Sequence, residues 1–195
     1  MPAVSHFFAY LSRMKLIERW GLMRSTRPEN TQEHSLQVAM FAHALAVLKN
    51  ERFGGDVDPE RAALLAVYHD AEEVITGDVP TPVKYFTPEV AGAMGGVADA
   101  ARDRLADMLP DDLRPHVAPL LRPRDEDADA WACVKAADKL AAYLKCVEEG
   151  AAGNREFAHA EAAIARQLDA LDDPAVDAFR ATFEDGFRRT LDELA

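Results

Sequence analysis

Hydrophobic residues recur at helical spacing along nearly the whole chain, and no run of β-branched residues alternates with period two over the length of a strand. This pattern predicts an all-α fold. The sequence shows no internal repeat and no low-complexity linker, so we expect residues 1–195 to form a single-domain helical bundle. A length of 195 residues agrees with one core, because single cores stop growing only well above this size.

Local start and stop signals divide the chain into helices and loops. Asn30 is a good N-cap with Glu33 three residues later, and Asp58 stands before a proline at the first helical position. Between the first two helices, residues 22–30 are expected to form a loop. The expected helices cover residues 7–20, 30–48, 58–77, 88–109, 125–149, 157–171 and 174–194.

Prolines and glycines mark the expected interruptions. Residues 78–82 hold two prolines and cannot continue a helix, and the prolines between 110 and 123 predict a connector. Gly92, Gly95 and Gly96 stand inside the expected helix over 88–109, where each costs about 1 kcal/mol relative to alanine. We therefore expect a break or close packing at these glycines.

The charge balance bears on the partners that the protein can bind. Lys and Arg total 22 against 34 Asp and Glu, so the formal net charge is −12 and the pI is about 4.9. No basic stripe is present to hold a nucleic-acid backbone, so we expect no polymeric DNA or RNA partner. A small anionic substrate would need a local cation or arginine to overcome the field of the whole protein.

The sequence also predicts a compartment. No stretch of 18 apolar residues occurs, and the N-terminal residues lack the pattern of a secretory signal, so we expect no membrane partner. Cys133 and Cys146 fall in one expected helix, too far apart along it to form a disulfide. A reducing cytoplasm is therefore the expected location.

Three expected helices each supply side chains that can bind a metal. These are His34, the adjacent pair His69 and Asp70, and Asp138. Two imidazoles and two carboxylates suit Mn, Fe, Co, Ni or Zn better than Ca or Mg. Glu73 follows His69 by four residues, which would put a proton-transfer carboxylate on the same helix face. The alternative is that these are capped or salt-bridged residues with a structural role.

Four long blocks of sequence carry a resemblance to a known family. In chain order they are SHFFAYLSRMKLIERWGLMR, EHSLQVAM, LLAVYHDAEEVITGDVPTPVKYF and VKAADKLAAYLKCVEE. The chain resembles the bacterial YfbR-type 5'-deoxynucleotidases of the HD-domain phosphohydrolase superfamily. The resemblance implies a helical HD-type domain that works as a homodimer. It also implies a metal-dependent phosphomonoesterase, using Co, Mn or another transition metal, that removes the 5'-phosphate from deoxyribonucleoside monophosphates.

The resemblance assigns roles to individual residues. It makes His34, His69, Asp70 and Asp138 the metal ligands, and Glu73 and Arg19 the catalytic residues. The substrate-binding residues that it implies are Arg19, Trp20, His69, Asp78, Val79, Pro80 and Thr81.

Each of these roles has a structural alternative. Arg19 would bind phosphate through its planar fork, or is a solvated cation at a helix end. Trp20 would stack on the base or ribose, or anchors the core. Asp78 would accept a hydrogen bond from the sugar 3'-hydroxyl, or caps a turn. Glu73 would donate a proton to the departing 5'-oxygen or orient the water, which the sequence does not distinguish, or is a surface acid on a helix that also contains Glu72.

Other functions stay open at this stage. The nearest is another HD phosphohydrolase, which would act on a cyclic dinucleotide, a hyperphosphorylated guanine nucleotide or a dNTP. A second is a non-catalytic helical module that binds nucleotides. The chain departs from the family over 92–96, where relatives carry bulkier and charged residues, so we expect the pocket wall or a dimer contact to differ there.

Overall fold

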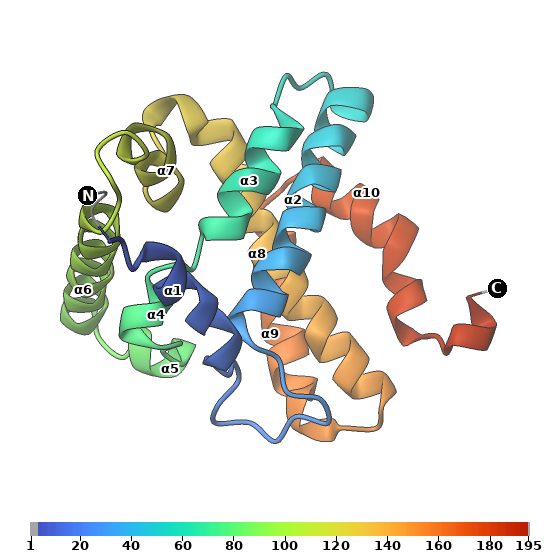
Figure 1. The fold of residues 1–195 in the computed structure, drawn as a ribbon. Helices are drawn as coiled ribbons and strands as arrows, with labels where there is room; N and C mark the ends of the chain where they lie inside the picture. Colours follow the sequence, from blue (N-terminus) through green and yellow to red (C-terminus); the bar gives the residue numbers. More distant parts are fainter. Residues whose placement is uncertain (1–3, 195) are drawn as a thin grey trace.

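Three helices form the centre of the protein. They are α2 (Thr31–Phe53), α3 (Pro59–Tyr68) and α8 (Ala128–Ala151), and each packs against the other two (Figure 1). The computed structural model describes residues 4–194, and within that range it contains no strand, only an isolated β-bridge. The prediction of an all-α fold is confirmed.

The remaining helices surround this centre. Helix α9 packs against α8, α10 packs against α2, and α6 lies against α4 and α7 on the opposite side of the molecule (Figure 1). The bounds of these helices are α1 (Phe7–Leu11), α4 (Glu73–Thr76), α5 (Thr81–Lys84), α6 (Pro88–Asp107), α7 (Arg114–Leu121), α9 (Ala158–Asp169) and α10 (Pro174–Phe183).

The starts of the central helices follow the sequence signals. The side chain of Asn30 accepts a hydrogen bond from the Glu33 N–H at 3.0 Å, and that of Asp58 accepts one from the Arg61 N–H at 2.9 Å. Each cap satisfies a backbone donor that the first helical turn leaves free. Gly54 has a φ of 70° and ends α2, as expected of glycine after a helix.

Two groups of buried apolar residues hold the helices together. The larger joins α2, α3, α8 and α10 and includes Leu45, Leu65 and Leu144. The smaller lies under α1, α6 and α7 and includes Phe7 and Leu105. Tyr68, the last residue of α3, packs against both groups, and Ala71 in the segment that links α3 to α4 belongs to the smaller one.

The expected continuous helix over 58–77 is wrong, because α3 ends at Tyr68 and α4 begins at Glu73. The ring Nδ1 of His69 lies 2.7 Å from the Ala66 carbonyl oxygen, which gives that oxygen a side-chain partner. Bonds of the i to i−3 type follow, including one from the Ala71 N–H to the Tyr68 carbonyl at 3.0 Å. The His69–Asp70 pair therefore lies in a turn at the end of α3.

The expected helix over 7–20 is also too long. Helix α1 ends at Leu11, a 3-10 turn follows (Ser12–Leu16), and Ile17 is extended. Residues 17–19 instead run beside 29–31, with the Arg19 N–H donating to the Glu29 carbonyl at 2.9 Å. This pairing replaces the hydrogen bonds that a longer first helix would have made.

Helix α6, the connector over 110–123 and the last helix also differ from the elements expected from the sequence. Helix α6 runs unbroken through its glycines, and a Cβ added at Gly92, Gly95 or Gly96 would meet nothing within 4 Å among the described residues. The expected break or close packing is therefore wrong. The connector over 110–123 contains α7, which has Pro115 in its first turn, where a proline leaves no donor unpaired, and also holds Pro119 in its interior. Helix α10 ends at Phe183, and 3-10 turns follow it (Glu184–Arg188 and Leu191–Glu193).

The expectation of no membrane partner can be compared with the length and hydropathy of the helices. In residues 4–194, none of the helices is both long enough and apolar enough for a bilayer crossing.

Candidate active site

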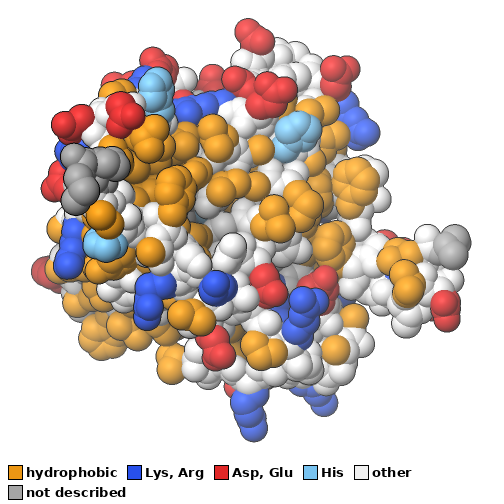
Figure 2. Space-filling view, in the orientation of Figure 1, with side chains coloured by type: hydrophobic (Ala, Val, Ile, Leu, Met, Phe, Trp, Pro, Cys, Tyr) orange, Lys and Arg blue, Asp and Glu red, His pale blue; other side chains and the backbone are white. Residues whose placement is uncertain are grey.

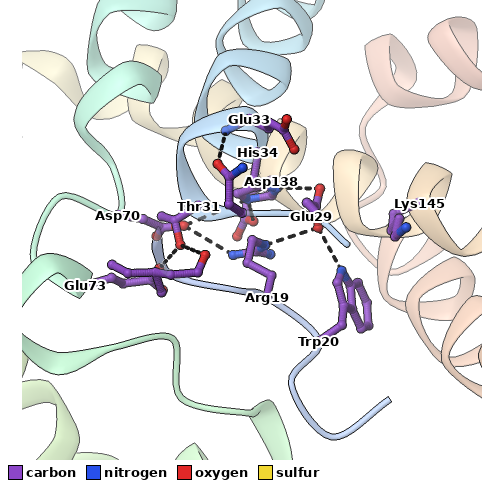
Figure 3. Close-up of polar contacts among 12 residues, drawn as sticks. Arg19, Trp20, Glu29, Thr31, Glu33, His34, Asp70, Glu73, Asp138 and Lys145 are labelled. Atoms are coloured by element: carbon purple, nitrogen blue, oxygen red, sulfur yellow. Dashed lines mark hydrogen bonds and ion pairs between the residues drawn. The ribbon is translucent and has the colours of Figure 1, made fainter. Parts of the chain in front are cut away.

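The four predicted metal ligands lie close together although they come from α2, from the turn after α3 and from α8. Figure 3 shows His34, Asp70 and Asp138 facing one another. His34 is in the first turn of α2, His69 and Asp70 follow the end of α3, and Asp138 is in the middle of α8. His34 is 0% exposed and His69 is 4% exposed. The site is rigidly placed, because α2, α3 and α8 are the helices that share the larger core.

The ligand atoms face one another at short distances. His34 Nε2 lies 3.0 Å from Asp138 Oδ1 and 3.9 Å from Asp70 Oδ2, and His69 Nε2 lies 3.0 Å from Asp70 Oδ2. The candidate donor atoms of His34, His69 and Asp70 all lie within 4.8 Å of one another. We call His34, His69, Asp70 and Asp138 the ligand cluster.

The donor chemistry of the ligand cluster fits a divalent metal. A carbonyl oxygen can only accept, so the contact with Ala66 places the proton of a neutral His69 on Nδ1 and leaves a lone pair on Nε2. That buried lone pair faces the Asp70 carboxylate, and no described residue donates a hydrogen bond to it. Two electron-rich atoms at this distance need a proton or a cation between them. Imidazole nitrogen and carboxylate oxygen together favour a transition metal.

The pKa values of the ligand cluster show which of its groups carry charge. Burial raises the pKa of Asp70, but the positive charges of His69, His34 and Arg19 overcome this effect and hold the pKa well below its usual range. Burial likewise opposes ionisation of Asp138, whose pKa falls to about 2 because of its hydrogen bond with His34 and the charge of His69. Burial lowers the pKa of His69, whereas Asp70 and Asp138 raise it to about 9. The carboxylates therefore stay ionised, and in the metal-free protein a proton on His69 supplies the positive charge between its ring and Asp70 that a bound metal ion would replace.

Glu73 differs from these carboxylates. Its Oε2 accepts a hydrogen bond from the Thr31 hydroxyl at 2.9 Å. Burial, together with the charges of Asp70 and Asp78, raises the pKa of Glu73 to about 8. Glu73 and His69 do not share one helix as expected, but α4 begins at Glu73 and keeps its carboxyl group in the site. The side chain therefore holds a proton near neutral pH.

Arg19 and Trp20 are placed by a carboxylate, Glu29, that no sequence motif indicates. Glu29 Oε2 accepts a hydrogen bond from Trp20 Nε1 at 2.8 Å and lies 3.4 Å from Arg19 Nε (Figure 3). Arg19 Nη1 donates to Asp70 Oδ2 at 3.4 Å. The Trp20 ring also packs against Phe157, with ring centroids 5.3 Å apart. Glu29 stood in the expected loop over 22–30, and no local signal marked it.

A cavity of about 840 Å³ opens over the ligand cluster. This volume is typical of a site for a small organic ligand. The predicted site residues that line it are Arg19, Trp20, Asp70, Glu73, Asp78, Val79, Pro80, Thr81 and Asp138. His34 and His69 do not line it, because both lie buried behind the carboxylates. Met94, Val97 and Ala98 of α6 form one wall, so the unusual stretch over 92–96 borders the cavity.

Comparisons with known proteins place the chain in a family. The model of the YfbR-like 5'-deoxynucleotidases matches residues 6–187. The chain belongs to the YfbR-like 5'-deoxynucleotidase family. The 5'-deoxynucleotidase of Vibrio cholerae is 53% identical over 191 residues, which cover 98% of each chain. The YfbR protein of Salmonella paratyphi B is 53% identical over 98% of this chain and 96% of its own. The family predicted from the sequence is confirmed, and with it a phosphomonoester hydrolase.

Solved structures agree with this assignment at the level of the fold. An HD-domain phosphohydrolase from Listeria innocua has a TM-score of 0.74 at 20% identity, covering 93% of this chain and 88% of its own. The cyanophage S-2L HD phosphohydrolase DatZ, solved with dA and one catalytic Zn²⁺ ion, has a TM-score of 0.66 at 22% identity and covers 93% and 96%. The YfbR-like chain therefore has the predicted HD-type fold.

Proposed function

We propose that this YfbR-like enzyme hydrolyses deoxyribonucleoside 5'-monophosphates to deoxyribonucleosides and inorganic phosphate. The observation that carries the proposal is the ligand cluster itself, whose buried lone pairs and carboxylates converge at one end of a cavity large enough for a nucleotide. The names of the relatives support the same substrate class. The neighbour DatZ, which binds a deoxynucleoside, agrees with it.

His34, His69, Asp70 and Asp138 would hold one divalent metal ion. When bound, such an ion lowers the pKa of a water molecule and neutralises charge on a phosphate oxygen. The Zn²⁺ in DatZ supports a transition metal. The donor set suits Co, Mn and Zn alike, so a metal panel has to identify the native ion.

Arg19, together with Lys84 and Lys139 of the cavity lining, supplies local positive charge in a chain of net charge −12. Its contacts with Glu29 and Asp70 use Nε and Nη1. A guanidinium has five N–H donors in a fixed plane, so others stay available for a phosphate oxygen in the cavity. Arg19 therefore orients the phosphate and stabilises the charge that develops on it.

Glu73 acts as the general acid. When water adds to phosphorus and the bond from phosphorus to the 5'-oxygen breaks, the departing oxygen takes up the proton that Glu73 holds. The raised pKa of Glu73 makes this proton available near neutral pH. Of the two roles left open by the sequence, the donor role is the one that its protonation favours.

Trp20 and the loop over 78–81 contact the nucleoside. The indole lines the cavity and is available to stack on the base or sugar, a contact that tolerates every base. Asp78 accepts a hydrogen bond from the 3'-hydroxyl. A 2'-hydroxyl would lack a partner against this compact loop, and an unpaired buried polar group costs about 1–3 kcal/mol. Deoxynucleotides are therefore preferred, and equal turnover of dAMP and AMP would contradict this part of the proposal.

The homodimer and the cytoplasmic location remain predictions. Large exposed hydrophobic side chains include Phe8 of α1, Leu36 and Met40 of α2, and Leu64 and Val67 of α3. Figure 2 shows hydrophobic side chains over the face where these helices lie. Light scattering on the purified protein should give twice the chain mass of 21.4 kDa. A monomer at micromolar concentration would contradict the dimer.

The test of the function is phosphate release from 5'-dNMPs, 5'-NMPs and 3'-dNMPs by protein that has been stripped with chelator and resupplied with Co, Mn, Mg or Zn. We expect metal-dependent release from 5'-deoxynucleotides. Glu73→Gln should lower kcat on the order of 100-fold or more, because it removes the proton donor. Glu33→Gln, whose side chain is 55% exposed, is the matched control and should match the wild type. No release with any metal would contradict the proposal.

A further inference from the structure

Glu29 is a buried carboxylate that lies between the proposed substrate residues Arg19 and Trp20 and the proposed metal ligand His34. It is 9% exposed, and it lies just before the N-cap of α2. One oxygen, Oε2, contacts Trp20 Nε1 at 2.8 Å and Arg19 Nε at 3.4 Å. The other oxygen, Oε1, lies 3.7 Å from His34 Nδ1. One side chain thus faces two of the proposed substrate residues, Arg19 and Trp20, and one proposed metal ligand, His34.

The backbone around Glu29 reinforces this connection. The Glu29 carbonyl accepts a hydrogen bond from the Arg19 N–H at 2.9 Å, beside the bridge between Glu18 and Asn30. Trp20 has a φ of 60°, a left-handed conformation that costs free energy for a residue with a bulky side chain. Such a conformation persists only where the surroundings hold it. The indole hydrogen bond to Glu29 is one of the contacts that do so.

The orientation of His34 gives Glu29 a second role. His34 Nε2 faces Asp138 and Asp70, so the lone pair that binds a metal must be on Nε2 and the proton on Nδ1. His34 Nδ1 is buried and has no hydrogen-bond partner among residues 4–194, and Glu29 Oε1 faces it at ion-pair distance. A carboxylate behind a ligating histidine fixes its tautomer and raises its basicity.

We propose that Glu29 is a positioning residue that couples substrate binding to metal binding. Through Oε2 it holds Arg19 and Trp20 toward the cavity, and through Oε1 it keeps the His34 Nε2 lone pair directed at the ligand cluster. This inference rests on the proposed function of the site. Glu29 itself is not expected to touch the substrate or the metal.

The test compares Glu29→Gln with Glu33→Gln, the same substitution at an exposed position of the next helix. Glu29→Gln is nearly isosteric but removes the charge that faces His34 and Arg19. We measure Co²⁺ affinity of the metal-free protein by competition with a chromogenic chelator, and kcat and KM for dAMP at saturating Co²⁺. We expect Co²⁺ affinity to fall about 10-fold or more, a typical loss for an outer-shell partner, and KM to rise several-fold. Glu33→Gln should match the wild type in every quantity.

A second variant at Glu29 separates the effect of the side-chain charge from that of the side-chain length. Glu29→Asp keeps the charge but is one methylene shorter, so it should recover most of the Co²⁺ affinity while KM stays raised. A purely structural role would lower only the unfolding midpoint, and wild-type Co²⁺ affinity and KM in folded Glu29→Gln would overturn the proposal. So would equal losses of Co²⁺ affinity in Glu29→Asp and Glu29→Gln. Absence of phosphate release by the wild type would contradict the proposed function instead, because Co²⁺ affinity is measured without turnover.

Discussion

Two polar clusters lie along α8, the ligand cluster and a second one, and they differ in whether their polar groups have hydrogen-bond partners and balanced charge. The second cluster is formed by Lys145 and Glu149 of α8 with Thr26, Arg27 and Asn154. Lys145 donates to Glu149 and, at 2.7 Å, to the Arg27 carbonyl. Glu149 also accepts from the Thr26 N–H and from Asn154 Nδ2, each at 2.8 Å. One cation and one anion meet there, and donors surround both carboxylate oxygens.

The ligand cluster lacks this balance. Asp70 and Asp138 face two imidazoles whose Nε2 atoms should carry lone pairs when the rings are neutral, and Arg19 is the one arginine that contacts them within residues 4–194. His34 Nδ1 and His69 Nε2 are buried without hydrogen-bond partners in the described part of the chain. A cluster that pairs all its groups stabilises the fold by itself. We expect the ligand cluster, whose unpaired nitrogens and carboxylates converge, to be completed by a bound metal ion.

The largest expected effect comes from removing one charge of the ligand cluster. Asp70→Asn should lower kcat/KM for dAMP on the order of 1000-fold, because Asp70 faces both imidazoles and Arg19. Steady-state kinetics at saturating metal measures this effect, with Glu33→Gln as the control. If Asp70→Asn retained a tenth of wild-type activity, the ligand cluster would not be the reaction centre.

The matching change in the second cluster should affect stability and spare metal binding. Glu149→Ala leaves the buried Lys145 ammonium without its ion-pair partner, and we expect a loss of about 3 kcal/mol in the free energy of unfolding. Urea unfolding measures the loss. Glu148→Ala, at the exposed neighbouring position, is the control and should change stability little. Equal stability of the two variants would remove the contrast between the clusters.

Acid should weaken the second cluster in a defined pH range. Burial opposes ionisation of Glu149, but Lys145, Thr26 and Asn154 lower its pKa from 4.5 to about 2. A lowered pKa in the folded state gives stability that is present above pH 4.5 and is lost as the pH falls toward 2. The stability advantage of the wild type over Glu149→Gln should therefore shrink over this range. A difference that stays constant with pH would show that the charge of Glu149 contributes nothing.

The smallest expected effect lies outside both clusters. Gly92 is exposed in the interior of α6, and an added Cβ meets nothing there within 4 Å of the described chain. Gly92→Ala should stabilise the protein by about 0.5–1 kcal/mol and leave metal affinity unchanged. Gly54 has a φ of 70°, so Gly54→Ala should destabilise by a similar amount. Thermal unfolding distinguishes the two, and a loss of stability in Gly92→Ala would contradict the open packing of α6.

Features that depend on local sequence could be predicted. The starts of α2 and α3 followed from capping side chains, and α8 followed from its apolar spacing together with small residues. The ligand cluster could be named because long blocks of the chain resemble a known family and because the helices that hold or precede its members were clear from the sequence. The all-α class followed from hydrophobic periodicity along the whole chain.

Features that depend on tertiary contacts could not be predicted from the sequence. The break after Tyr68 depends on a side-chain bond between His69 and the Ala66 carbonyl, which periodicity does not reveal. Glu29 is buried only because residues 17–19 pair with 29–31, two segments that the sequence presents as a helix end and a loop. Burial of a charge by such a pairing leaves no local signal.

The most direct test of the central claim is a crystal structure of the protein soaked with Co²⁺, with anomalous diffraction recorded at the cobalt edge. The account predicts one strong peak bound by His34 Nε2, His69 Nε2, Asp70 and Asp138, and no ion at the Lys145–Glu149 cluster. An active, metal-loaded crystal with no peak between these four side chains would contradict it.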